Sequence, residues 1–219
     1  MRARWWRLLP AALLVLLLVG CAQGAAEQDR VVRGEGLFGV VLDDPARKPD
    51  AVLTDHRGEP FDLRAETDGT LTLAFFGYAS CPDICPVHLA NLSAVFDRLP
   101  STVTDEINVL FITTDPARDT PAALAEFMTA FDDDFVGLTG ELADILEVMA
   151  DLGLPEPVFG DPDADGFYEV GHPAQVIAFL PTDDRAHYAY PWGTRQADFT
   201  EDLRALVRAD PAHETDRPG

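Results

Sequence analysis

The sequence predicts an α/β domain in which helices flank a central mixed sheet in three layers, with a β-hairpin at its N-terminal side. Short apolar runs that suit buried strands alternate along the chain with amphipathic segments that suit helices. A turn containing Gly58 separates two short apolar segments, which is typical of a hairpin. With 47% hydrophobic residues, the chain can bury the core that such a domain needs.

The expected elements follow one another in a regular order. They are an edge strand over 37–42, a hairpin over 52–54 and 61–63, strands over 71–76 and 109–113, helices over 86–99, 121–131 and 198–208, a helix between 139 and 153, and a hairpin over 175–180 and 187–190. Thr120 and Thr139 are expected to cap helices, because threonine hydroxyls accept hydrogen bonds from the first free N–H groups. This order fits a thioredoxin-like domain.

The first twenty residues are expected to be an export signal. Three arginines precede an apolar run over residues 8–19 that is short for a membrane span. Leu18, Val19, Gly20 and Cys21 resemble the lipobox of bacterial lipoproteins, so Cys21 is expected to carry a lipid; an uncleaved signal anchor is the alternative.

The resulting domain plan has four parts. Residues 1–20 are a lipoprotein signal peptide, 21–49 a tether and first edge strand, 50–210 the thioredoxin-like domain and 211–219 a tail. The lipid would place the protein at the cell membrane, anchored on its extracytoplasmic face.

The strong acidity of the chain limits its partners. The formal charge is −22, and it becomes −25 without the three arginines of the signal. Such a charge repels nucleic acid and anionic lipid surfaces, so no nucleic-acid partner is expected.

Two cysteines carry the candidate chemistry. Apart from Cys21, only Cys81 and Cys85 remain, which excludes a scaffold held by several disulfides and favours redox work or metal binding. They lie between a buried strand and a helix, where the helix N-terminus is expected to lower the pKa of a thiol. A spacing of four residues allows both sulfurs to face one ion, and soft thiolates suit Cu(I). A spacing of three would be usual for a rapidly cycling disulfide.

Three motifs resemble the Sco/SenC family, and the resemblance covers most of residues 51–208. The motifs are FFGYASCPDICP at 75–86, TDPARDTP at 114–121 and FVGLTG at 135–140. The resemblance implies a thioredoxin-like fold that binds one copper ion, Cu(I) or Cu(II), through Cys81, Cys85 and His172. It further implies a role in maturing cytochrome c oxidase, with the copper-containing subunit of the oxidase as partner and other copper chaperones or thiol reductants as further partners.

The surroundings of His172 depart from the family pattern. The family usually has Asp-His-Ser, whereas this chain has Gly171, His172 and Pro173, which removes a carboxylate that could orient the imidazole. Because Pro173 precedes a strand, where thioredoxin-like folds commonly place a cis-proline, and because a cis X–Pro bond costs only about 0.5–1 kcal/mol, a cis bond between residues 172 and 173 is expected.

The remaining histidines are weaker candidates. His88 lies three residues after Cys85 and is a rival ligand on the same helix. His56, His187 and His213 are expected at the surface.

The segment 155–171 is long and acidic, and it is expected to be a mobile loop that brings His172 to the thiols. Asp161, Asp163, Asp165 and Gly166 resemble the start of a calcium loop. Calcium is disfavoured, because Pro162 occupies the second position of that loop and His172 stands where a bidentate Glu should be.

Three functions use the same two thiols. The first is a copper metallochaperone, which needs His172, and the second is a thiol-disulfide reductase that keeps the copper-ligand cysteines of an oxidase subunit reduced, with Cys81 and Cys85 as the redox-active pair. The third is a peroxidase-like enzyme, for which Arg118 would have to activate a cysteine. The sequence favours the metallochaperone.

Overall fold

The structure, a computed structural model, describes residues 36–208. Its main sheet has eight strands in the order β1-β10-β9-β4-β5-β6-β2-β3, and a separate two-stranded sheet pairs β7 with β8. The strands are β1 (Val40–Val41), β2 (Val52–Asp55), β3 (Pro60–Asp62), β4 (Leu71–Gly77), β5 (Ile107–Thr113), β6 (Val136–Thr139), β7 (Val158–Phe159), β8 (Val170–Gly171), β9 (Val176–Phe179) and β10 (Ala186–Tyr190). The helices are α2 (Ile84–Phe96), α3 (Ser101–Thr104), α4 (Pro121–Met128), α5 (Leu142–Asp151) and α6 (Gln196–Leu206).

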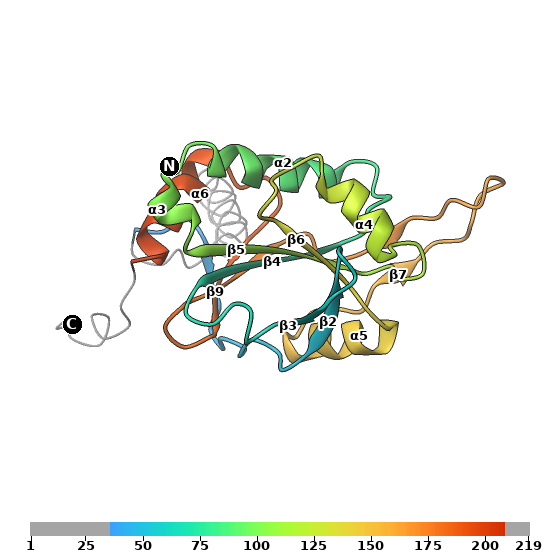
Figure 1. The fold of residues 1–219 in the computed structure, drawn as a ribbon, viewed down its shortest axis with the longest axis horizontal. Helices are drawn as coiled ribbons and strands as arrows, with labels where there is room; N and C mark the ends of the chain where they lie inside the picture. The colour runs from blue at the N-terminus through green and yellow to red at the C-terminus, as the bar shows by residue number, and fades with distance from the viewer. Residues whose placement is uncertain (1–35, 209–219) are drawn as a thin grey trace, which may run out of the picture. The chain divides into compact units, whose positions relative to one another are not determined.

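The central strand β4 separates two apolar layers. All seven of its residues are buried, because it lies between parallel β5 and antiparallel β9 and is covered on both faces. Leu71, Leu73 and Phe75 pack toward the core below α2, α4 and α6, whereas Ala74 and Phe76 belong to the core against α5. Figure 1 shows α2 and α4 on one side of the sheet and α5 on the other. The predicted three-layer α/β fold with a mixed sheet is confirmed.

Most predicted elements lie within a few residues of their expected place. Thr120 caps α4 as predicted, since its hydroxyl accepts a hydrogen bond from the Ala123 N–H at 3.3 Å. The prediction for Thr139 is wrong: it ends strand β6, paired with Thr54, and Glu141 is the N-cap residue of α5. The apolar pattern did not predict β6, which pairs in parallel with β5 and antiparallel with β2, and Thr139 belongs to the pairing with β2.

The acidic segment before His172 forms a β-ribbon rather than an irregular loop. Val158 pairs with Gly171 and Phe159 with Val170, and the Gly160 N–H donates to the Glu169 carbonyl at 2.9 Å. At its turn, Asp163 Oδ1 accepts hydrogen bonds from the N–H groups of Asp165 and Phe167. In the part of the chain that the structure describes, no helix is long and apolar enough to cross a bilayer.

A buried carboxylate joins the first described residues to the last helix. Asp202 of α6 is fully buried and accepts hydrogen bonds from the N–H groups of Phe38 and Gly39 at 2.8 and 2.9 Å. The Tyr190 hydroxyl donates to the same carboxylate at 3.0 Å. Strand β1, at the edge of the sheet, follows directly, so Asp202 fixes where the chain enters the domain.

Replacing Asp202 by Ala should lower the free energy of unfolding by about 2–4 kcal/mol, because two buried donors and one partly buried donor lose their acceptor. Urea unfolding followed by circular dichroism measures the change. Glu201→Ala is the matched control, since this neighbouring carboxylate is exposed on the same helix. Equal stability of the Asp202→Ala and Glu201→Ala proteins would contradict the anchoring role.

Candidate metal centre

The end of β4 and the start of α2 deliver the two thiols. The chain leaves β4 at Gly77 and enters α2 at Ile84, whose N–H donates to the capping side chain of Asp83 at 2.6 Å. Cys81 lies before the helix and Cys85 in its first turn, and the Cys85 N–H points at the Cys81 sulfur at 3.4 Å. Both cysteines are buried and free. The thiols therefore face each other beneath the surface.

His172 completes a three-residue cluster with the thiols. Its Nε2 lies 3.4 Å from the Cys85 sulfur, and the ligand atoms of Cys81, Cys85 and His172 all lie within 4.8 Å of one another. Its Nδ1 is 3.0 Å from the Pro173 carbonyl, which can only accept, so Nδ1 carries the proton and the Nε2 lone pair faces the sulfurs. A backbone carbonyl thus orients the imidazole in place of the missing carboxylate.

Burial changes the expected acidity of the site. Desolvation raises the pKa of the Cys85 thiol well above its ordinary value, although a hydrogen bond from the Tyr78 backbone acts in the opposite direction. The expectation of a lowered pKa is therefore wrong for this cysteine, because removal of the thiol from water is the largest influence on it. Metal binding would have to displace the proton of Cys85.

The peptide bond between His172 and Pro173 is trans, so the prediction of a cis bond is wrong. In this position the Pro173 carbonyl is the partner of His172 Nδ1 and the next carbonyl, that of Ala174, is bound by His88. The carbonyls of the two residues after His172 therefore both accept hydrogen bonds that help to hold this segment in place.

A buried polar segment between β5 and α4 holds the loop of the thiols. Asp119 Oδ2 accepts hydrogen bonds from the Ala79 N–H at 2.9 Å and from the Thr113 hydroxyl at 2.6 Å. The Thr114 N–H donates to the Gly77 carbonyl at 2.6 Å, where the chain leaves β4. The TDPARDTP motif at 114–121 thus fixes the start of the dithiol loop, a role that its sequence alone does not indicate.

His88 contacts the segment of His172 rather than joining the cluster. It is 2% exposed, and its Nε2 lies 2.9 Å from the Ala174 carbonyl. Its ring packs against Phe75 and Trp192, with centroids 4.8 and 5.0 Å apart. Burial lowers the pKa of His88, which favours a neutral ring that donates through Nε2. Its spacing on the helix made it a rival candidate to His172 but could not show this carbonyl.

The other candidates serve different contacts. His56 Nδ1 accepts a hydrogen bond from the Gly137 N–H at 3.1 Å, and His187 pairs with Asp183 at 2.8 Å. Arg118 donates a hydrogen bond to Asp115 and stacks on the ring of Tyr168, so it contacts the ribbon. Cys21 and His213 lie outside the described residues.

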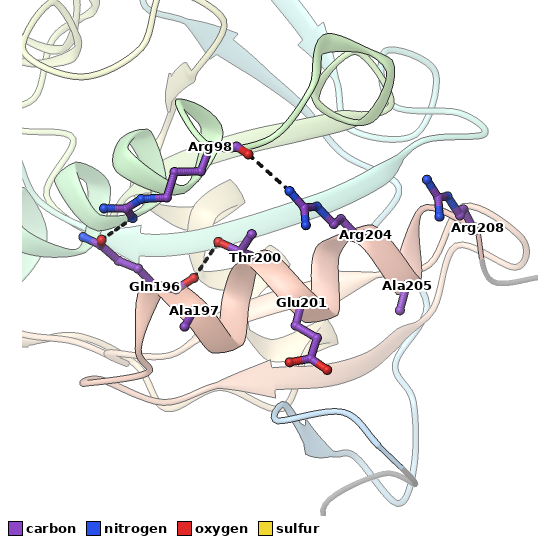
Figure 2. Close-up of a pocket in the computed structure, with 8 residues that line it drawn as sticks. All are labelled: Arg98, Gln196, Ala197, Thr200, Glu201, Arg204, Ala205 and Arg208. Carbon is purple, nitrogen blue, oxygen red and sulfur yellow. Dashed lines mark hydrogen bonds between the residues drawn. The ribbon is translucent and has the colours of Figure 1, made fainter.

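A groove of about 870 Å³ lies at the far end of α2, along α6. Figure 2 shows that Arg98, Arg204 and Arg208 line it together with Gln196. It contains no thiol or imidazole, so its chemistry is unrelated to that of the cluster.

A thioredoxin-like fold that presents two buried thiols and one imidazole defines a protein able to hold a single soft or borderline metal ion. The SCO1/SenC family model matches residues 44–208, and the chain belongs to this family.

Known relatives share the fold across most of the chain. The mitochondrial SCO2 homolog of Bos taurus is 33% identical and aligns with 90% of this chain and 75% of its own. The copper-bound ScoI of Bradyrhizobium japonicum is 30% identical with a TM-score of 0.64, covering 74% of this chain and 98% of its own. Copper-bound yeast Sco1 is 25% identical with a TM-score of 0.66, covering 82% and 96%. Matches to sco1 of fission yeast and to the SCO2-like proteins of Rickettsia conorii and Rickettsia felis span less than half of those chains.

Gly77 is a site residue that the sequence analysis missed. A Cβ atom built on Gly77 would lie 2.6 Å from the Cys85 sulfur and 2.8 Å from Cε2 of Phe111. The thiol therefore occupies the space that any side chain would need. A glycine at the end of a largely apolar strand, just before the cysteine loop, was the available signal.

Gly77→Ala should displace the Cys85 sulfur, weaken metal binding and lower the free energy of unfolding by about 1–3 kcal/mol through overpacking. Metal titration and thermal unfolding measure the two effects. Gly171→Ala is the control, because a Cβ there would meet Val158 at an ordinary 3.6 Å. If both variants bind metal equally well, the close approach at Gly77 does not position the thiol.

Proposed function

We propose that this protein is a copper-binding metallochaperone that assists assembly of the copper centre of cytochrome c oxidase. The observation that carries the proposal is the convergence of two thiols and one imidazole nitrogen, from segments 87 residues apart in sequence, within 4.8 Å of one another. Family membership and the copper-bound relatives support it. The copper-containing subunit of the oxidase is the proposed recipient.

The donor set suits both oxidation states of one copper ion. Two thiolates satisfy Cu(I), which is soft and accepts low coordination, whereas Cu(II) favours a site that includes imidazole nitrogen. Oxidation to a Cys81–Cys85 disulfide would remove both sulfur ligands and make copper uptake dependent on redox state.

Substitution of single ligands should affect the two oxidation states unequally. His172→Ala should weaken Cu(II) binding by about 100-fold or more and leave most Cu(I) binding, while Cys81→Ser or Cys85→Ser should impair both. Anaerobic titration of the reduced protein with each ion, with bound copper counted, measures this. The thiolate-to-copper absorption band should also shift in His172→Ala.

His187→Ala is the matched control, since this histidine lies on β10 and pairs with Asp183. Unchanged Cu(II) affinity in His172→Ala would remove His172 from the site. Failure of the reduced protein to bind copper, together with turnover of disulfide substrates, would favour the thiol-disulfide reductase instead.

We further propose that the protein is held at the extracytoplasmic face of the cell membrane by a lipid on Cys21. The support is the lipobox at residues 18–21 after a basic and apolar segment. A lipid anchor would keep the copper site close to a membrane-bound recipient.

Cys21→Ala should move the protein from the membrane fraction to the soluble fraction, because the acylated residue is lost. Cell fractionation and the mass of the N-terminal peptide test this. Cys81→Ser, which keeps Cys21, should remain with the membrane. An N-terminal peptide without added lipid mass in the unaltered protein would refute the anchor.

A further inference from the structure

Arg118 lies in a cage of aromatic rings between the β5–α4 loop and the ribbon. Its guanidinium carbon is 3.6 Å from the centroid of the Tyr168 ring, and the rings of Tyr78 and Phe167 lie 5.5 and 5.6 Å away. A cation within about 6 Å of a ring centroid is attracted to the ring face. Tyr168 and Phe167 belong to the ribbon, and Tyr78 precedes the dithiol loop, so this one cation contacts both segments that carry the site.

Asp115 adds a second link between the same segments. This fully buried carboxylate accepts a hydrogen bond from Arg118 Nε and another, at 3.0 Å, from the Tyr168 hydroxyl. Among residues 36–208, Arg118 Nη2 is buried without a hydrogen-bond partner, so this end of the guanidinium depends on the rings around it. We call Arg118, Asp115 and Tyr168 together the ribbon clamp.

The clamp lies close to His172 along the chain. Tyr168 precedes His172 by four residues, and on the other side the Ala174 carbonyl is bound by His88. The imidazole itself meets the Tyr78 ring edge-on, with centroids 5.7 Å apart. His172 is thus held from both sides, whereas Cys81 and Cys85 belong to the main core cluster around α2 and the end of β4.

We propose, on the basis of the proposed copper function, that Arg118 and Tyr168 are positioning residues that determine how strongly the site prefers Cu(II). With the clamp closed, His172 Nε2 lies at the thiols and a three-ligand site is preformed. With the clamp broken, the ordering of the ribbon must be supplied by copper binding itself, which lowers affinity. Only Cu(II) needs the imidazole, so the clamp strengthens Cu(II) binding. Cu(I) binding depends on the two thiolates and is not affected by the clamp.

Tyr168→Leu and Arg118→Leu test the proposal from the two sides of the contact. Each should weaken Cu(II) binding about 10- to 100-fold, the range typical of residues that orient a ligand, and leave Cu(I) affinity unchanged. Tyr168→Phe keeps the ring face and should retain most of the Cu(II) affinity. Near-ultraviolet circular dichroism checks folding, and Tyr168→Leu keeps the buried Arg118–Asp115 pair if Arg118→Leu fails to fold.

Arg57→Leu is the matched control, because it also removes an arginine from a buried aspartate, Asp55, in the β2–β3 hairpin. It should change neither affinity. In a His172→Ala background, Tyr168→Leu should cause no additional loss of Cu(II) binding. Equal loss of both ions, an additive loss in that background, or full Cu(II) affinity in Tyr168→Leu would overturn the clamp.

A measurement without metal separates failure of the clamp from failure of the copper function. Amide hydrogen exchange of the ribbon, including the Gly160 N–H, should be several-fold faster in Tyr168→Leu than in the unaltered protein. Unchanged exchange would refute the clamp even in a protein that binds copper. Faster exchange in a protein that binds no copper would support the clamp as a device holding His172 and overturn the metallochaperone proposal alone.

Discussion

Two buried carboxylates hold together the segments that form the site. Asp119 fixes the backbone at Ala79, before the dithiol, and Asp115 fixes Tyr168, before the histidine. Both lie in the short turn that follows β5, at most 1% exposed. Because β5 is parallel to β4, this turn lies at the same edge of the sheet as the end of β4. Ligands distant in sequence are thus placed by one buried turn at the end of the central strand β5.

Burial of the thiols disfavours the charged thiolate, and this affects the chemistry of the site. Desolvation raises the pKa of Cys85, so the protein alone keeps this sulfur protonated, and a cation is needed to stabilise the thiolate. A surface thiol pair would ionise and exchange more readily. The close contact between the Cys85 sulfur and Gly77 fixes its position as well as its burial.

The sequence predicted the parts of this protein that local patterns determine. Apolar runs placed β4 and β5, and Thr120 placed the start of α4, because these depend on neighbouring residues. Thr139 was misassigned since its sheet pairing with Thr54 comes from a strand 85 residues earlier in the chain. The partner of His88 is likewise a carbonyl 86 residues away, and no helical spacing could reveal it.

The candidate site shows the same difference between features set by local sequence and features set by long-range contacts. The two cysteines could be read from one continuous motif, but the orientation of His172 depends on contacts of the ribbon, which lies outside the main sheet. Apart from Val170, the paired strands of the ribbon are poorly covered, with Val158 71% and Phe159 44% exposed. A segment with so few buried apolar contacts opens more easily than the strands of a core. The dithiol is therefore the rigid part of the site and His172 the adjustable part, an arrangement that would let one protein hold copper with two ligands or with three.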